Sequence, residues 1–400
     1  MRRSRWILVT LLALALLGTF SQTAQATPQF ARTYNLNCGA CHTLPPMLNA
    51  GGQNFLQRGY RPSPDSDRPV LATAPLAGWF TARQENQLDR RFGEMYLNRV
   101  EFITAGPLPI PLLEDKFSYF LEWRAGSLES RTNGTLRDRS GRFEDAFIMW
   151  QMTERLQLTA GQFRSLTQID VSRRLSISEP AAFSTSLPGE PAGDARITSL
   201  RGFSPSGRSP GFMLQYQSIQ GSAAANGLFH SVVVPFVGEW SLPITPEAHQ
   251  EANFVSQGPP KGVFLETYYR HALNTIGAHA FIDNDRWLFT MVGNLNYTGS
   301  PWTKNIHVTG AVGWDDTNQT DLRNRWSVDT LFLPDLFKNH PLKTGLGFRA
   351  ERVTGPRTFP AYIPYVVLAG PNTSYTTLLQ VEYRHQENNR GFFMDLSLIF

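Results

Sequence analysis

The feature that most constrains this chain is an alternation of apolar and polar side chains in short segments from about Trp79 onward. In the stretch "KNIHVTGAVGW", the alternate positions from Ile306 to Trp314 are apolar or glycine, whereas the other set begins with Asn305 and His307. Alternate residues of a β-strand point to opposite faces, so a period of two indicates strands with two different faces. The segments are about nine to twelve residues long. We therefore expect an all-β fold over this part of the chain.

A soluble β-sandwich and a membrane-spanning barrel both alternate in this way, but the barrel turns its apolar face outward, with aromatic residues near the strand ends. The segment lengths match the ~9–11 residues that cross a bilayer at a tilt. Trp287 and Tyr297 bracket one segment, and Trp314 closes the next. The last stretch, "GFFMDLSLIF", carries one apolar face: Phe392, Met394, Leu396, Leu398 and Phe400. These features favour a closed transmembrane barrel, which has no open sheet edge.

We count about sixteen such segments. They lie near residues 79–85, 92–104, 116–127, 141–151, 155–163, 197–204, 211–219, 226–236, 261–272, 275–283, 286–297, 303–314, 322–333, 342–352, 372–384 and 390–400. An additional strand is possible near Tyr362–Leu368. The long loops, 164–196 and 237–260, are rich in Pro, Gly and Ser. This set of strands does not place all the long loops on one side of a barrel, so at least one strand in it is misplaced.

The N-terminal segment 1–26 has the pattern of a cleaved export signal. A basic start with Arg2, Arg3 and Arg5 precedes an apolar run from Trp6 to Leu17, and Ala24-Gln25-Ala26 fits a cleavage site. The apolar run is shorter than the ~20 residues of a spanning helix. Removing three arginines from the 37 Lys and Arg leaves 34, against 33 Asp and Glu. A mature chain near neutrality gives no reason to expect a nucleic-acid partner.

Both cysteines of the chain lie in one C-x-x-C-H unit, formed by Cys38, Cys41 and His42. In an exported protein this spacing predicts covalent attachment of one c-type haem, with the histidine as an axial iron ligand. A zinc site would need further Cys or His ligands nearby, and the next histidine is His230. A redox dithiol would need a βαβ context, which the flanking sequence does not show.

The predicted cytochrome domain, residues 27–72, is small for a haem protein. It has room for one or two helices, with Pro46 suited to a helix start and Gly59 to a helix stop. Its apolar residues cover only part of a porphyrin: Phe30, Tyr34, Leu36, Leu44 and Phe55. A sixteen-strand barrel has an aqueous lumen that can receive such a domain. We therefore expect a small α-helical haem plug completed by the wall of the 73–400 barrel.

The stretch "FARTYNLNCGACHTLPPMLNAGGQNFLQRGY" resembles the N-terminus of the fused monohaem cytochrome–porins, the outer-membrane iron oxidases of iron-oxidising bacteria. The positions that match the family pattern are Phe30-Ala31-Arg32, Cys38 to Thr43, Pro46, Leu48-Asn49, Gly52, Phe55 and Gly59-Tyr60. The chain departs from the pattern at Thr33-Tyr34, where Gln-Thr is usual, and at Leu56, where Lys is common. The match is close over about thirty residues and only architectural over the barrel.

The resemblance implies a Gram-negative outer-membrane protein whose haem, held by Cys38, Cys41 and His42, passes electrons from dissolved extracellular Fe(II) to a periplasmic cytochrome c. If it is an enzyme, it is an Fe(II):cytochrome c oxidoreductase. Outer-membrane barrels of this kind also present a last strand and terminal aromatic, here Phe400, to the barrel insertion machinery. Two alternatives stay open: a porin whose haem domain is a structural or gating plug, and a conduit for electron flow outward.

The second axial ligand is open between Met47 and a barrel residue such as His307. Met47 is only five residues from His42, so its reach to the opposite haem face is marginal. The alternation predicts a set of charged residues facing the lumen: Arg99, Glu101, Glu122, Arg124, Arg325, Asp329, Arg349, Glu351, Glu382, Arg384 and Asp395. We expect a salt-bridged wall there rather than an Fe(II)-binding path, because no carboxylate or histidine cluster has metal-site spacing.

Overall fold

The computed structural model describes most of the barrel and part of the N-terminal segment. The described residues are 30, 34, 36, 38–61, 76–88, 92–108, 116–130, 136–138, 141–167, 175–178, 180–182, 208–218, 226–235, 262–282, 287–297, 305–316, 322–334, 342–354, 359–370, 376–386 and 390–399. The predicted export signal 1–26 and Phe400 lie outside them. Within these residues, no helix combines the length and apolar character needed to cross a membrane.

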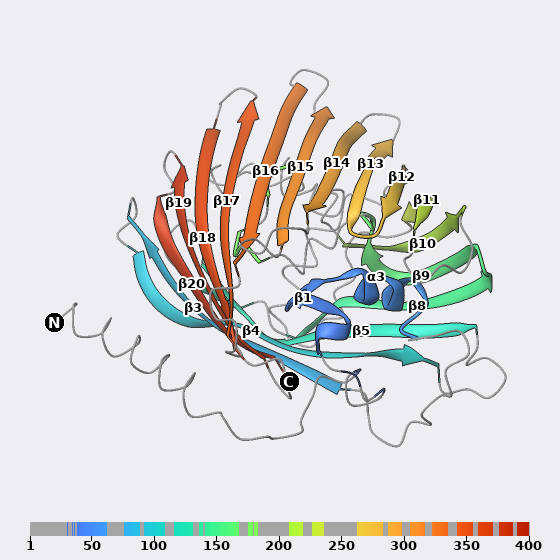
Figure 1. Cartoon of the computed structure of the whole chain (residues 1–400), viewed down its shortest axis with the longest axis horizontal. Helices are drawn as coiled ribbons and strands as arrows, with labels where there is room; N and C mark the ends of the chain where they lie inside the picture. Colours follow the sequence, from blue (N-terminus) through green and yellow to red (C-terminus); the bar gives the residue numbers. More distant parts are fainter. Residues whose placement is uncertain are drawn as a thin grey trace.

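A closed antiparallel barrel makes up most of the described chain (Figure 1). Its sixteen described strands are β3 (Leu76–Gln87), β4 (Phe92–Pro107), β5 (Phe117–Gly126), β8 (Arg142–Thr153), β9 (Leu156–Arg164), β10 (Arg208–Gln217), β11 (Gly227–Pro235), β12 (Val263–His271), β13 (Asn274–Ile282), β14 (Trp287–Tyr297), β15 (Asn305–Asp316), β16 (Leu322–Leu333), β17 (Lys343–Thr354), β18 (Phe359–Ala369), β19 (Thr376–Gln386) and β20 (Gly391–Ile399). Each pairs with the strand before and after it, and β20 pairs with β3 to close the ring. A small hairpin of β6 (Leu128–Ser130) and β7 (Leu136–Asp138) lies in the connection after β5.

The strands turn their apolar faces outward, as the alternation predicts. On β11 the exposed positions include Leu228, Val232 and Val234, whereas Ser231 between them is buried. Trp287 and Tyr297 are the first and last residues of β14, and both are exposed. A soluble domain hides large apolar side chains, and an exposed apolar face that continues around the molecule is the surface a membrane-spanning barrel offers to lipid.

The predicted lumen set lies on the inner face. Glu101, Arg325, Arg349 and Glu382 are at most 1% exposed, whereas their neighbours along each strand are half-buried or exposed. The remaining predicted members are buried or half-buried: Arg99, Glu122, Arg124, Asp329, Glu351, Arg384 and Asp395. The prediction of an inward polar face is therefore confirmed for all eleven residues.

The structure bears on two further strand predictions, of which the one near Tyr362–Leu368 is confirmed. The segment predicted at 197–204 lies outside the described residues, and the barrel closes without it because β9 pairs directly with β10. The additional strand considered near Tyr362–Leu368 belongs to the barrel as β18, which pairs with β17 and β19. Short apolar runs in polar loops resemble strands in sequence, and only pairing decides between them.

The order of strands in the barrel also shows at which end the two long connections lie. Only β10 and β11 separate the 165–207 connection from the 236–262 connection, so both leave the same end of the barrel. We call this the loop end. The opposite end, where β3 begins and β20 finishes, is the plug end, since the N-terminal segment enters β3 there.

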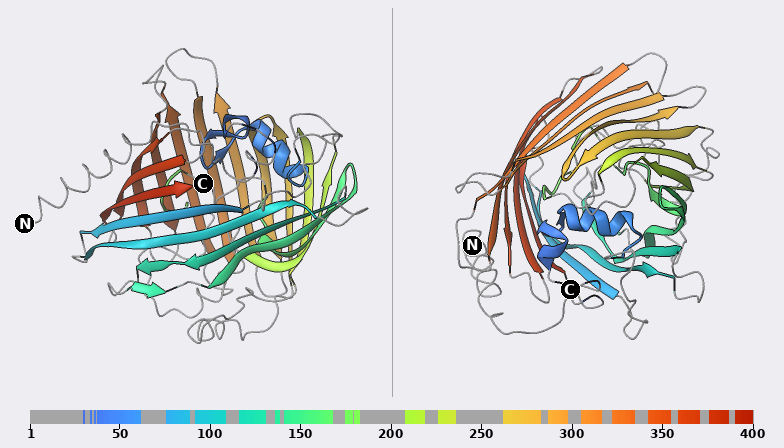
Figure 2. Two further views of the ribbon diagram at one scale, coloured as in Figure 1. Left: turned by 90° about the horizontal axis from the view of Figure 1, so that it is seen from below. Right: turned by 45° about the vertical axis from the view of Figure 1, so that its right-hand side comes forward.

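The plug segment, residues 38–61, lies inside the ring of strands (Figures 1 and 2). It contains a 3₁₀ turn η1 (Cys38–Ala40), a short hairpin of β1 (His42–Leu44) and β2 (Met47–Leu48), and one helix, α3 (Ala50–Gln57). The helix start predicted at Pro46 is wrong, because Pro45-Pro46 forms the turn of the hairpin and Asn49 caps α3. The helix stop at Gly59 is confirmed: its φ of 64° is a left-handed conformation that favours glycine. Residues 38–61 of the plug segment thus contain one helix and one short hairpin.

Candidate functional site

The C-x-x-C-H unit occupies one compact turn of the plug segment. Cys38 begins the 3₁₀ turn and is buried, Cys41 follows it and is half-buried, and His42 opens β1. Cys41 N–H donates to Cys38 O (3.2 Å), and the two thiols are not joined in a disulfide. Burial raises the pKa of the Cys38 thiol above its ordinary value, and a backbone hydrogen bond offsets part of this rise. One short turn therefore carries both cysteines.

The ring of His42 is oriented by the hairpin that follows it. Its Nδ1 lies 3.1 Å from the carbonyl oxygen of Pro46. Because a carbonyl can only accept, Nδ1 carries the proton, and the lone pair is then on Nε2. Metal-binding histidines are commonly held in this way, with one ring nitrogen donating to a carbonyl and the other facing the metal.

Asn49 connects the C-x-x-C-H turn to α3. Its main-chain N–H donates to Cys41 O (2.9 Å), and its side-chain Nδ2 donates to Gly39 O (2.8 Å). Its Oδ1 accepts from Gly52 N–H (3.0 Å), which is the N-cap bond of the helix. One residue therefore binds the turn and the helix together. Sequence reasoning matched Asn49 to the family pattern but assigned it no role.

Met47 is directed to the barrel wall. In the hairpin it pairs with Leu44, and it packs against a buried apolar cluster to which Leu44 belongs. The wall members of this cluster are Leu331, Leu333, Tyr365, Val367, Ala369 and Leu378. This packing does not favour Met47 as a second axial ligand. His307 lies on β15, whose side chains are outside the described part of the chain.

A second apolar cluster holds the other side of the plug segment. Phe55 and Tyr60 pack with Ala105, Phe120 and Met149 of β4, β5 and β8. Tyr60 and Phe120 stack with ring centroids 5.7 Å apart. Arg61 Nη2 adds a hydrogen bond to Phe117 O (3.1 Å). Since the first cluster is on β16 to β19, the plug segment bridges two separated parts of the wall near the plug end.

A segment of the 165–207 connection folds into the lumen from the loop end. We call its described residues, 175–178 and 180–182, the strap. Glu382 accepts from the main-chain N–H groups of Ile177 (2.9 Å) and Ser178 (3.0 Å), and Glu351 accepts from Ala181 N–H (2.9 Å). Arg349 donates to Ser176 Oγ (2.9 Å), to the main-chain carbonyl of Ser178 (2.9 Å) and to its hydroxyl. The predicted lumen charges thus bind a loop that the sequence did not place in the lumen.

The strap shares an apolar cluster with the plug segment. Leu175 belongs to the same apolar cluster as Leu44, which is two residues after His42. Its carbonyl accepts from Gln380 Nε2 (2.7 Å). The strap, the barrel wall and the C-x-x-C-H hairpin therefore contribute to one apolar cluster inside the lumen.

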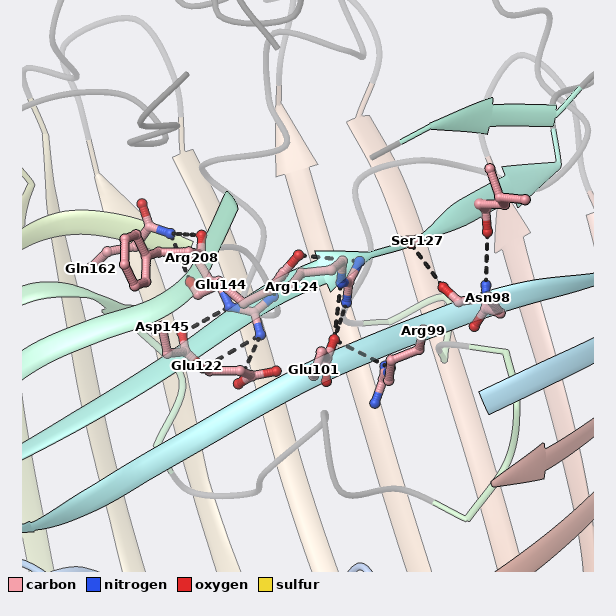
Figure 3. A network of polar contacts seen from close by, with 12 residues as sticks. Asn98, Arg99, Glu101, Glu122, Arg124, Ser127, Glu144, Asp145, Gln162 and Arg208 are labelled. Atoms are coloured by element: carbon pink, nitrogen blue, oxygen red, sulfur yellow. Dashed lines mark hydrogen bonds and ion pairs between the residues drawn. The ribbon is translucent and has the colours of Figure 1, made fainter. Parts of the chain in front are cut away.

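A network of ion pairs covers the wall across β4, β5, β8 and β10 (Figure 3). Arg124 pairs with Glu101 (2.7 Å) and Glu144 (3.1 Å), while Arg99 also pairs with Glu101 (3.3 Å). Arg208 pairs with Asp145 (2.8 Å), with Glu122 (3.7 Å) and with Glu144. Because the members are nearly all shielded from solvent, mutual pairing compensates their desolvation. The prediction of a salt-bridged wall is confirmed here.

Among the described residues, no three or more His, Cys, Asp or Glu side chains are grouped so that they could hold a metal ion. The C-x-x-C-H turn lies inside the barrel in a segment that packs on two apolar clusters of the described wall.

No family model matches the chain, and no curated protein matches its sequence. Among solved structures it is similar to OmpTdeltaL8, a loop-deletion mutant of an outer membrane protein of Vibrio cholerae (9% identity, 81% of this chain and 97% of that chain, TM-score 0.46). It is also similar to the outer membrane channel DcaP of Acinetobacter baumannii (10%, 81% and 96%, 0.46). A third is Salmonella typhi OmpF in complex with daunomycin (10%, 81% and 96%, 0.48). The strand pairing above, rather than these likenesses, establishes the barrel.

Proposed function

We propose that this chain is an outer-membrane electron-transfer protein that carries one covalent c-type haem inside a porin-like barrel. Cys38 and Cys41 hold the haem through thioether bonds, and His42 is an axial ligand of its iron. The observation that carries the proposal is the placement of the C-x-x-C-H turn within a closed barrel whose outer face is apolar.

The local geometry supports the cofactor assignment. The bond from His42 Nδ1 to Pro46 O selects the ring tautomer in which Nε2 is the nitrogen able to ligate iron. The two thiols precede this histidine in one turn, with neither committed to a disulfide. These residues fit the donor set of a c-type haem.

The surface supports the membrane assignment. Exposed Phe212, Leu214 and Val234 on β10 and β11 are followed around the barrel by Trp326, Phe348 and Phe392. An exposed apolar belt of this extent is stabilised by lipid and is costly in water. In outer-membrane barrels the longer loops lie outside the cell and the short turns face the periplasm. By that rule the loop end faces outward and the plug end faces the periplasm.

In this orientation the plug segment is reached from two sides. Dissolved Fe(II) is the donor at the outer side, and a periplasmic cytochrome c accepts at the plug end. When bound, the haem supplies a one-electron centre, so that one Fe(II) becomes Fe(III) for each electron passed to the carrier. The chain's own residues supply enclosure: the wall and the strap surround the hairpin that bears His42. Outer-sphere transfer needs no acid–base groups at this position.

The test is anaerobic stopped-flow mixing of the purified, oxidised protein with Fe(II), following the haem absorbance. We expect reduction that requires the haem and is therefore lost in the Cys38→Ala, Cys41→Ala double variant. The reduced protein should then reduce a periplasmic cytochrome c. If excess Fe(II) leaves the haem oxidised while a reduced carrier readily reduces it, electrons flow outward and the proposed direction is overturned.

A second candidate function is a porin in which the plug segment is structural. The two apolar clusters that fix Leu44 and Phe55 to separated parts of the wall favour it. This candidate predicts a haem signal without turnover, so sustained Fe(II)-driven reduction of a carrier distinguishes the two.

A further inference from the structure

Three consecutive carbonyls of the C-x-x-C-H turn meet the first turn of α3. Gly39 O accepts from Asn49 Nδ2, and Cys41 O accepts from Asn49 N–H. The carbonyl of Ala40 lies against Gly51, where a Cβ would overlap the oxygen. The first turn of a helix carries unpaired N–H groups and a partial positive charge, which suits carbonyl oxygens.

Glycine makes this approach possible. At Gly52 a Cβ would overlap Cys41 O and would come within 2.8 Å of the Leu48 side chain. The haem-attachment turn and the helix therefore touch backbone to backbone at Gly51 and Gly52. Of the residues at this contact, Asn49 is the one whose side chain makes hydrogen bonds to both parts.

We propose that Asn49 is the positioning residue of the haem-attachment turn: through Gly39 it holds the C-x-x-C-H loop against α3 and so fixes the thiols and His42. The inference rests on the proposed function for the identity of the cofactor. Asn49 exerts this effect through one hydrogen bond, from its Nδ2 to Gly39 O (2.8 Å).

Substitutions at Asn49 separate this role from that of a helix cap. Asp and Ser both accept from the N–H of Gly52 and remain good N-caps, but neither can donate an amide N–H to Gly39 O. Asp would also place a carboxylate oxygen against a carbonyl. Ala loses both the N-cap bond to Gly52 N–H and the hydrogen bond to Gly39 O. A residue that only caps α3 would tolerate Asp and Ser, whereas a residue that positions the turn would not.

The first measurement uses the full-length chain folded without haem and follows alkylation of Cys38 and Cys41 by iodoacetamide. We expect Asn49→Asp, Asn49→Ser and Asn49→Ala each to accelerate alkylation about tenfold, because the loop opens more often without its clamp. Asn54→Ala is the matched control. It lies on the same helix, its side-chain oxygen has no hydrogen-bond partner in the described part of the chain, and it should leave the rate unchanged.

The second measurement uses the haem-loaded protein and compares midpoint potential and imidazole binding. Asn49→Asp and Asn49→Ser should shift the potential and change imidazole affinity, whereas Asn54→Ala should not. Wild-type behaviour of the Asp and Ser variants in both measurements would overturn the proposal and leave Asn49 as a helix cap. A wild type that carries no covalent haem would instead overturn the proposed function, and the alkylation rates would still decide the role of Asn49.

Discussion

The carboxylate of Glu382 on β19 accepts a hydrogen bond from the main-chain N–H of Ile177, a residue 205 positions earlier in the chain (2.9 Å). Both are buried, and Arg349 binds the same stretch of backbone from β17. The charged side chains of the inner wall therefore bind protein backbone within the lumen. They bind a loop whose Leu175 belongs to the same apolar cluster as Leu44 of the hairpin that carries His42.

Replacing Glu382 with Gln should loosen the strap. The neutral amide removes the counter-charge that Glu382 supplies to Arg384 and accepts less well from the N–H groups of Ile177 and Ser178. We expect cleavage of the 165–207 connection by added protease to become about tenfold faster. The matched control is Glu154→Gln, which changes an exposed residue in the β8–β9 turn. Equal cleavage rates in both variants would show that the strap does not depend on this carboxylate.

The barrel seam should depend on one ion pair. Arg83 on β3 donates two hydrogen bonds, both of 2.7 Å, to the carboxylate of Asp395 on β20. Asp395→Asn should lower the free energy of unfolding by about 2 kcal/mol, since it leaves a largely shielded guanidinium without its partner. Arg83→Met should do the same, and the double variant should lose less than the sum. Strictly additive losses in denaturant titrations of the folded barrel would contradict a coupled pair.

The aromatic contact at Phe120 should keep the plug segment in place. Phe120 stacks on Tyr60 and on Phe147, and truncation to Ala should cost about 3 kcal/mol of this packing. We expect the variant to show more frequent open-channel events in planar bilayer recordings than the wild type. Phe392→Ala makes the same change on the outward face of β20 and should leave the conductance unaltered. An unchanged conductance recording for Phe120→Ala would show that the apolar cluster around Leu44 is enough to hold the plug segment in place.

Haem attachment should follow the two thiols and the ring of His42. The wild-type protein should retain haem stain after denaturing electrophoresis, and Cys38→Ala with Cys41→Ala should abolish it. His42→Ala should alter the absorbance spectrum and potential even where thioether bonds survive. The control is His230→Ala, which removes an imidazole from the outward face of β11. Loss of haem from the denatured wild-type protein would contradict covalent attachment to Cys38 and Cys41.

The sequence by itself determined which side chains face inward and which face out. That outcome follows from a local rule, because alternate residues of a strand point to opposite faces whatever the strand pairs with. For this reason Arg349, Glu351 and Glu382 were predicted in the lumen, and Trp287 and Tyr297 at strand ends, without knowledge of the barrel. The C-x-x-C-H unit was equally local, since its meaning lies in the spacing of five residues.

Only the tertiary structure decided what the inward groups bind. Strand pairing decided that β9 lies next to β10 in the barrel and that β18 lies between β17 and β19. The hairpin at Pro45-Pro46 placed Met47 against the apolar cluster that includes Leu44, and the packing of α3 on the C-x-x-C-H turn gave Asn49 its contact with Gly39. These contacts join residues from different elements or from strands far apart in the chain. Hydrophobic periodicity does not predict such pairs, because it indicates which face of a strand a side chain lies on and not which residue it contacts.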